Sequence, residues 1–162
     1  MEFTDVLTSL RRIIRTVNLE SKRIEKEYGI SIPQLLCLHF LRKQAHYQAS
    51  HKQLKDQLSL NASTITGIIS RLEKKGLVAK LPRHGDRRVS LVTLTARGED
   101  LLINSPQPMH LKLSRKLEKL SPEELDKLQQ AFVLISNFLE ADDLDASPIL
   151  TSETSLNNNP EG

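Results

Sequence analysis

The sequence is poor in the residues that form disulfide frameworks and aromatic clusters. It has one cysteine (Cys37), no tryptophan, four phenylalanines and two tyrosines in 162 residues. A single cysteine excludes an internal disulfide framework and favours a reducing compartment. No stretch approaches the ~20 apolar residues of a membrane span, and the first five residues lack the apolar core of a signal peptide. We therefore expect a cytoplasmic protein with one hydrophobic core and no membrane contact.

Signatures of catalysis and of metal binding are also missing from the sequence. It has no nucleophile–base pair, no glycine-rich phosphate loop and no H-E-x-x-H motif, so we expect neither an enzyme nor a cofactor. His39, His46 and His51 are seven and five residues apart, which does not place them on one helical face, and we expect no metal site. Cys37 lies in an apolar segment, which favours a small core residue over a reactive thiol.

Charge is distributed unevenly along the chain. Residues 51–97 contain ten Lys and Arg against three Asp and Glu, whereas residues 121–162 contain one Lys against nine acids. A basic middle followed by an acidic end indicates a polyanion-binding protein whose C-terminal part faces elsewhere. Two solvated faces of opposite sign are the alternative interpretation.

The first half of the chain has helical periodicity. Apolar residues three or four apart predict an amphipathic helix over 5–28, and a buried second helix follows Ser31. Ser50 with Gln53 forms a capping box before a short helix over 51–58. A further helix over 62–75 begins after Asn61 and ends at Gly76.

The periodicity then changes from helix to strand. Residues 77–81 and 89–94 alternate as strands, and a cationic loop joins them. Thr95 then caps a helix that Pro106 and Pro108 interrupt, and Ser121 to Glu124 forms a strong start for the last helix. The acidic and Ser/Asn-rich end has the composition of a disordered tail.

These elements predict a mainly α fold with a small β-hairpin wing, a winged helix-turn-helix. We expect four regions: an N-terminal dimerisation helix (1–30), a DNA-binding lobe (31–94) with recognition helix 62–75 and wing 77–94, C-terminal dimerisation helices (95–140), and the acidic tail (141–162).

In a winged helix the second helix of the pair enters the major groove of duplex DNA. Small and hydroxyl side chains allow close approach and contact phosphates or base edges, and an arginine makes the bidentate contact to guanine. The candidate DNA contacts on this helix are Ser63, Thr64, Thr66, Gly67, Ser70 and Arg71. An ordinary helix whose Ser and Thr face water is the alternative.

The loop between the strands supplies the second set of candidate DNA contacts. Arg83, Arg87 and Arg88 at a hairpin tip can reach the minor groove, where narrow A·T-rich segments attract guanidinium groups. Asp86 repels phosphate, so we expect it to pair with one of these arginines and to orient its side chain.

Three segments in this order and spacing resemble the MarR family of regulators: Leu72 to Val78, Asp86 to Arg88, and Leu94 to Gly98. The resemblance implies a homodimeric repressor that binds a palindromic operator and pairs through its first and last helices. It also implies that Arg88 is the minor-groove arginine and Asp86 its partner. The apolar positions expected at that interface are Val6, Leu10, Leu117, Leu125, Leu128, Phe132, Ile135 and Leu139.

Three further segments resemble the EctR/CosR group of that family: Leu10 to Arg15, Tyr28-Gly29 with Pro33 to Leu35, and Leu144 to Leu150. Its members repress compatible-solute synthesis or uptake in salt-adapted bacteria, which implies a role in osmotic stress. The family resemblance also implies a small-molecule effector pocket, for which the candidate residues are Ile14, Tyr28, Leu38, His39, Phe40 and Tyr47. Direct response to ionic strength is the competing idea.

Two other functions are compatible with the same sequence. One is a protein–protein adaptor that uses a winged helix without binding DNA. The other is a redox- or metal-responsive regulator, in which Cys37 or the histidines would carry the signal.

Overall fold

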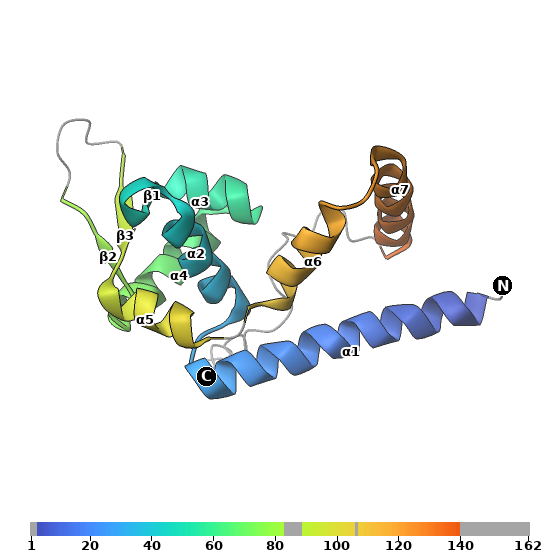
Figure 1. The fold of residues 1–162 in the computed structure, drawn as a ribbon, viewed down its shortest axis with the longest axis horizontal. Helices are drawn as coiled ribbons and strands as arrows, with labels where there is room; N and C mark the ends of the chain where they lie inside the picture. Colours follow the sequence, from blue (N-terminus) through green and yellow to red (C-terminus); the bar gives the residue numbers. More distant parts are fainter. Residues whose placement is uncertain (1–2, 83–88, 106, 140–162) are drawn as a thin grey trace, which may run out of the picture.

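The computed structural model describes residues 3–82, 89–105 and 107–139, and it is mainly helical with one small antiparallel sheet (Figure 1). This confirms the predicted fold class. The elements in chain order are α1 (Phe3–Tyr28), α2 (Ile32–Lys43), a 3-10 turn η1 (Ala45–Tyr47), β1 (Gln48–Ser50), α3 (His51–Leu58), α4 (Ala62–Lys74), β2 (Val78–Lys80), β3 (Leu91–Leu94), α5 (Ala96–Asn104), α6 (Met109–Leu117) and α7 (Pro122–Phe138). No helix within the described ranges is both long and apolar enough to cross a membrane.

Helix starts lie where the capping residues predict them. Ser31, Ser50, Asn61, Thr95 and Ser121 each accept a hydrogen bond from the backbone N–H three residues later. The N-terminal N–H groups of a helix have no partner inside the helix, so such a side chain removes an unfavourable end. Local sequence therefore determines where these helices begin.

The expected break in the C-terminal helices is also present. Helix α5 ends at Asn104, and α6 begins after Pro108. The backbone N–H of Met109 donates to Glu20 Oε1 of α1 at 2.5 Å, so a carboxylate from α1 lies at the N-terminus of α6. A negative charge is favourable there because of the helix dipole. This contact attaches α6 to α1.

The sheet has three strands in the order β1-β3-β2, whereas the sequence predicted only the hairpin of β2 and β3. In β1 Ala49 lies opposite Val92, and in β2 Ala79 lies opposite Thr93. Strand β1 has only three residues, of which only Ala49 is buried, and it runs directly into the capping box of α3. Alternation over three residues is too short to distinguish a strand from a loop.

Helix α2 lies at the centre of the winged-helix lobe, where α3, α4, α5 and the sheet surround it (Figure 1). Its apolar surface is buried nearly all round, as a helix with so few polar residues requires. The buried core combines α2 with the inner faces of its neighbours: Leu35, Leu38, Leu41, Leu54, Ile65, Ile69, Leu72, Val78 and Val92 are its largest members in this lobe.

Cys37 lies inside this core. Its side chain is fully buried, and burial raises the pKa of the thiol to about 12. The reactive form of cysteine is the thiolate, so a thiol with this pKa is unreactive near neutral pH. The expectation of a core cysteine is consistent with this position.

The turn after α4, the chain entering β2 and the first turn of α5 form a closely packed junction. Gly76 follows α4 with φ +70°, and Thr95 Oγ1 donates to the Gly76 carbonyl at 2.7 Å. Thr95 Oγ1 also accepts from the Gly98 N–H at 3.1 Å. A Cβ on Gly98 would lie 2.7 Å from Leu94 Cδ1 and closer still to the Leu77 carbonyl oxygen. Only glycine therefore allows α5 to pack this closely on the strand.

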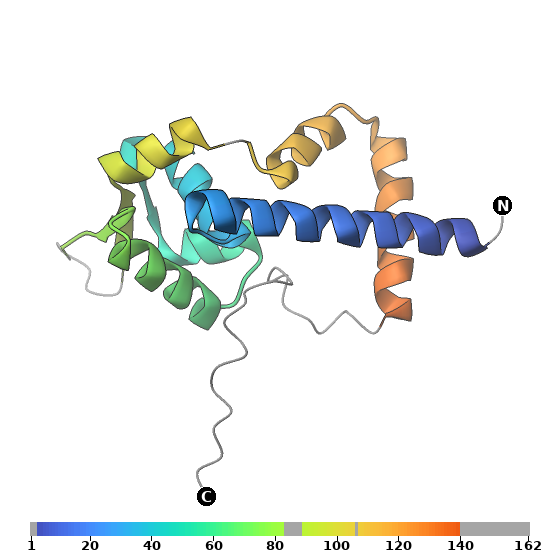
Figure 2. The ribbon, with the colours of Figure 1, turned by 90° about the horizontal axis from the view of Figure 1, so that it is seen from below.

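The terminal helices extend away from the lobe. Both views show α6, α7 and the N-terminal half of α1 on the side remote from the sheet (Figures 1 and 2). None of the described residues of α6 or α7 is buried, and α1 buries only Ser21 and Ile24. These helices expose large apolar side chains instead, which include Phe3, Val6, Leu7, Ile13, Leu125, Phe132, Val133, Leu134 and Phe138.

We predict that Gly98→Ala lowers the free energy of unfolding by about 1–3 kcal/mol, because the added methyl group forces apart packed backbone. The matched control is Gly67→Ala on α4, whose Cβ would lie 3.8 Å from Arg71 and meet no closer atom. There the better helix propensity of alanine raises stability by up to ~1 kcal/mol. Urea unfolding of both variants at one protein concentration measures the difference. Equal stabilisation by both substitutions contradicts the close approach at Gly98.

We predict that Cys37 does not react with a thiol reagent such as DTNB in the folded protein at pH 8, because burial leaves the thiol protonated and inaccessible. In urea the same protein reacts with one equivalent of reagent. The absorbance of the released thiolate measures both. Rapid stoichiometric labelling of the folded protein shows that this site is open.

Candidate DNA interface

Helix α4 has one buried face and one exposed face. Ile65, Ile68, Ile69 and Leu72 point into the core and are at most 3% exposed. The rest of the helix surface includes the small, hydroxyl and cationic residues that the sequence predicts as DNA contacts: Ser63, Thr66 and Arg71 are exposed, and Thr64, Gly67 and Ser70 are half-buried. The buried face fixes the rotation of α4 in the lobe and thereby determines which side chains face outward.

The first turn of α4 holds its polar groups in a defined arrangement. Asn61 Oδ1 accepts from the Thr64 N–H at 2.8 Å and from Ser63 Oγ at 2.7 Å. Thr66 Oγ1 donates to the Ala62 carbonyl at 2.9 Å. Both hydroxyl oxygens keep lone pairs that can accept from base amino groups, and rotation of the hydroxyl makes each a donor to phosphate.

Arg71 extends along the exposed face of α4. One of its guanidinium nitrogens lies 3.8 Å from the position that a Cβ on Gly67 would occupy. Because Gly67 has no side chain, the arginine can lie flat over the helix one turn toward its N-terminus. This places a planar donor group among the hydroxyl side chains of the same face, where it can bind guanine or phosphate.

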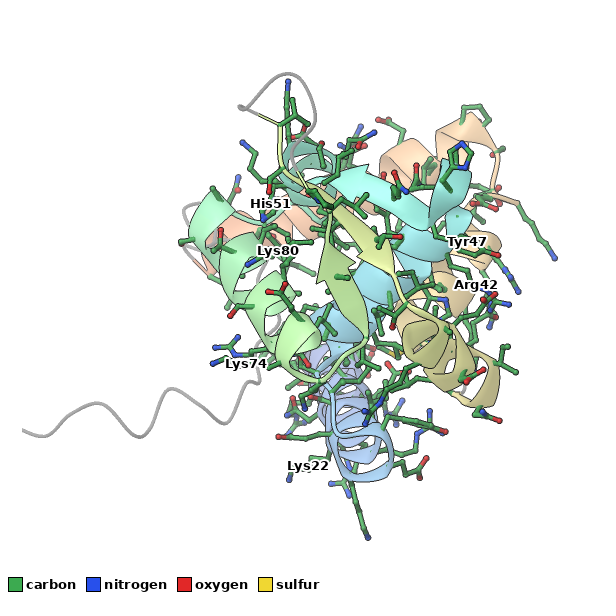
Figure 3. All side chains as sticks on the ribbon, turned by 90° about the vertical axis from the view of Figure 1, so that its left-hand side faces the viewer. Lys22, Arg42, Tyr47, His51, Lys74 and Lys80 are labelled. Carbon is green, nitrogen blue, oxygen red and sulfur yellow. The ribbon has the colours of Figure 1, made fainter. Side chains whose placement is uncertain are left out.

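Additional cations are exposed on neighbouring elements of the lobe. Lys52 and Lys55 are exposed on α3, and Lys80 at the end of β2 forms an ion pair of 3.1 Å with Glu73. In Figure 3, His51, Lys80 and Lys74 follow one another along one side of the sheet, and Arg42 and Tyr47 lie on its other side. The exposed ion pair contributes under about 1 kcal/mol to folding, so its effect is mainly to position Lys80.

The expected wing contacts lie outside the described residues. These are Arg83, Asp86, Arg87 and Arg88. The described structure ends at the base of the wing, where the Leu81 N–H donates to the Leu91 carbonyl at 2.9 Å. His51 Nδ1 lies 3.4 Å from the Ser90 carbonyl, so the start of α3 also contacts this base. Sequence reasoning missed this contact because the two residues are far apart in the chain.

The candidate effector residues are distributed over three parts of the fold. Leu38 is fully buried in the core, and His39 and Phe40 are half-buried on α2. Ile14 lines a groove along α1, whereas Tyr28 lines a separate cleft at the end of that helix.

Tyr28 and Tyr47 both use their hydroxyl groups within the protein. Tyr28 Oη donates to the Asn104 carbonyl at 3.3 Å, and Tyr47 Oη donates to Glu99 Oε1 at 3.4 Å. Tyr47 has φ +58°, and it follows His46 with φ +55°. Residues other than glycine rarely adopt a positive φ, so this turn holds two strained residues in succession.

His39 holds an unusual buried atom. Its Nε2 is buried and has no hydrogen-bond partner within the described part of the chain. Burial lowers the pKa of the imidazole, and the nearby charges of Arg42 and Lys43 lower it further. His39 therefore stays neutral near pH 7. Within the described residues, no group of three or more His, Cys, Asp or Glu side chains is placed to hold a metal ion.

Comparison with known proteins agrees with this geometry. The MarR family model matches residues 30–90. The HTH-type transcriptional regulator YfiV of Bacillus subtilis (strain 168), itself uncharacterized, is 32% identical over 111 residues, which cover 68% of each chain. The HTH-type transcriptional regulator PecS of Dickeya dadantii (strain 3937) is 31% identical over 126 residues, or 76% of this chain and 75% of PecS.

Solved structures share the fold at low sequence identity. The MarR family regulator Sco3205 from Streptomyces coelicolor, solved in complex with DNA, has a TM-score of 0.62 at 21% identity and covers 86% of this chain and 90% of its own. The S. aureus MepR–DNA complex has a TM-score of 0.60 at 16% identity, covering 85% and 98%. Residues 30–90, which the family model matches, include α2, α3, α4 and β2. The chain belongs to the MarR family of DNA-binding transcriptional regulators.

Proposed function

We propose that this regulator is a dimeric repressor that binds a palindromic promoter site and thereby occludes the promoter. The observation that carries the proposal is the outward face of α4, where small and hydroxyl residues share the helix surface with Arg71, whose guanidinium lies over Gly67. A helix with such a face can approach the base edges closely enough to distinguish them.

The N-terminus of α4 enters the major groove in this proposal. The helix dipole attracts phosphate to this end, and Ser63, Thr64 and Thr66 lie in its first turns. Gly67, Ser70 and Arg71 follow one turn later on the same face. Lys52 and Lys55 on α3 and Lys80 on β2 are the proposed contacts to the flanking backbone.

The wing extends the contact to the minor groove. Arg83, Arg87 and Arg88 are the proposed contacts, with Asp86 as the orienting partner of an arginine. Residues 31–94 thus form the proposed DNA-binding lobe. A protein that acts in this way works in the cytoplasm, on the bacterial chromosome.

Dimerisation would cover the exposed apolar surface of the terminal helices. Helix stability in proteins comes mainly from tertiary packing, yet α7 has 17 residues and buries none of them. Val6, Leu125, Phe132 and Leu139 are exposed, and Leu10, Leu117, Leu128 and Ile135 are half-buried. A second copy that packs on residues 1–30 and 95–140 would bury this surface. Two-fold symmetry would then place two α4 helices on a palindrome.

Control of osmotic-stress genes is the narrower proposal, and it has the support of the EctR/CosR resemblance of residues 10–15, residues 28–35 and residues 144–150. Binding dominated by phosphate contacts weakens steeply with salt, which would give a direct response to ionic strength. A small-molecule effector is the alternative signal.

We predict that the protein binds the DNA upstream of its own gene more tightly than a scrambled duplex, with affinity falling steeply as salt rises. Fluorescence anisotropy over a salt series measures both effects. Arg71→Gln reduces affinity for the native duplex about tenfold, since a bidentate base contact is worth roughly 1–3 kcal/mol. Arg88→Ala also weakens binding through the wing.

The matched control is Lys112→Gln, which removes an exposed cation on α6 and leaves the α4 face intact. It keeps the affinity of the original chain. Equal and weak binding of both duplexes contradicts sequence-specific repression and favours the protein–protein adaptor. Retained affinity in Arg71→Gln or Arg88→Ala removes that arginine from the contact set.

We predict that Phe132→Asp converts the dimer to a monomer, because a charge on the apolar face of α7 cannot be buried without a partner. Light scattering after size-exclusion chromatography measures the mass. Val89→Asp is the control, since Val89 is 47% exposed and lies in the wing, outside the terminal helices. A Phe132→Asp variant that stays dimeric places the interface elsewhere.

A further inference from the structure

A cleft lies where the end of α1, the end of α4 and the start of α5 meet. Its volume is about 400 Å³, which is within the range of small-molecule sites. It is lined by Tyr28, Gly29, Ile30, Lys74, Lys75, Leu77, Arg97 and Leu101.

The floor of the cleft is apolar. Ile30 and Leu77 belong to the buried core, and Tyr28 and Leu101 are half-buried and pack against it. The hydroxyl of Tyr28 is bonded to the Asn104 carbonyl, so the cleft offers its ring rather than its polar atom. Such a floor favours a hydrocarbon group over water.

The walls of the cleft carry three cations. Lys75 Nζ donates to the Gly29 carbonyl, which ties the end of α4 to the end of α1. This bond uses one of three donors on the ammonium group. Arg97 crosses Gly76, with its Cδ 3.9 Å from the position of a Cβ there. The absent side chain at Gly76 leaves room for the arginine beside Lys74.

No carboxylate lines the cleft among the described residues, and neither Lys74 nor Arg97 has an ion-pair partner there. Three like charges in one cleft repel each other, and a bound anion relieves that repulsion. DNA phosphate is not the expected anion. The 13 residues of α4 span roughly 20 Å, and Lys74 lies at the end opposite to the one that meets the bases.

We infer that this cleft is a binding site for a small aliphatic carboxylate. The carboxylate is held by Lys74, Lys75 and Arg97, and the hydrocarbon body lies on Ile30, Leu77 and Leu101. The bound molecule contacts the ends of α1 and α4, the residue before β2 and the start of α5 at once, so in this proposal it changes the angle between α1 and the DNA-binding lobe. This effect on DNA binding rests on the proposed function, whereas binding of the carboxylate does not.

NMR titration of the full chain without DNA, at constant ionic strength, tests the site. The probe is hexanoate, with hexanamide as the uncharged match and inorganic phosphate as the anion without a hydrocarbon body. Hexanoate binds at least tenfold more tightly than either, with the largest amide shifts at residues 28–30, 74–77 and 97–101. Equal affinity for hexanamide overturns the inference, because the cations then do not contribute to binding. Equal affinity for phosphate also overturns it, because the apolar floor then does not contribute.

Variants separate this cleft from a general attraction to basic protein. Arg97→Gln and Lys74→Gln each weaken hexanoate binding severalfold, and Lys112→Gln leaves it unchanged. Arg97 and Lys74 are exposed, and an unchanged thermal midpoint confirms that each variant is folded. Unchanged hexanoate affinity in both cleft variants overturns the site.

A DNA titration then tests the regulatory part separately. Hexanoate changes the affinity for the upstream duplex, and the change disappears in Arg97→Gln. Hexanoate binding with no effect on DNA affinity overturns the regulatory coupling, while the proposed binding site remains supported. Loss of specific DNA binding with hexanoate binding retained overturns the proposed function instead.

Discussion

The contact between the first turn of α5 and the chain leaving α4 is the constraint on which the other elements depend. Gly98 lies against the Leu77 carbonyl, and that carbonyl also accepts from the Thr95 N–H at 3.1 Å. Thr95 in turn binds the Gly76 carbonyl through its hydroxyl. Thr95 thus binds the turn after α4 and the residue before β2, and it begins α5, the helix that leads to α6.

The same junction links the winged-helix lobe to the terminal helices. Helix α4 ends at it, β2 starts from it, and α5 passes from it toward α6, which Glu20 attaches to α1 at Met109. A rotation of α1 relative to the lobe therefore acts on α4 through few and rigid contacts. Packed cores and tight junctions resist continuous deformation, so small displacements at one end are transmitted rather than absorbed.

Local signals in the sequence were sufficient for the long helices and the hairpin, but not for β1 or for the surfaces between the elements. Capping by Ser31, Ser50 or Ser121 acts over three residues, so the sequence alone reveals it. The outward face of α4 follows from the periodicity of its isoleucines. Strand β1 escaped prediction because its partner β3 lies more than forty residues later. The cleft at Lys74 and Arg97 escaped because it combines three distant segments, none of which has a motif of its own.

The winged-helix lobe has its own hydrophobic core, whereas the terminal helices bury few side chains. Helices α2, α3 and α4 bury leucine and isoleucine side chains against one another and the sheet, whereas α7 leaves Phe132 52% and Phe138 77% exposed. Burial of apolar surface contributes roughly 25 cal/mol per Å². Covering the two exposed phenylalanines would therefore stabilise α7 substantially. Formation of α7 and its packing against a partner are therefore coupled. Any partner that covers this surface also affects how firmly α1 and α6 are held against the lobe.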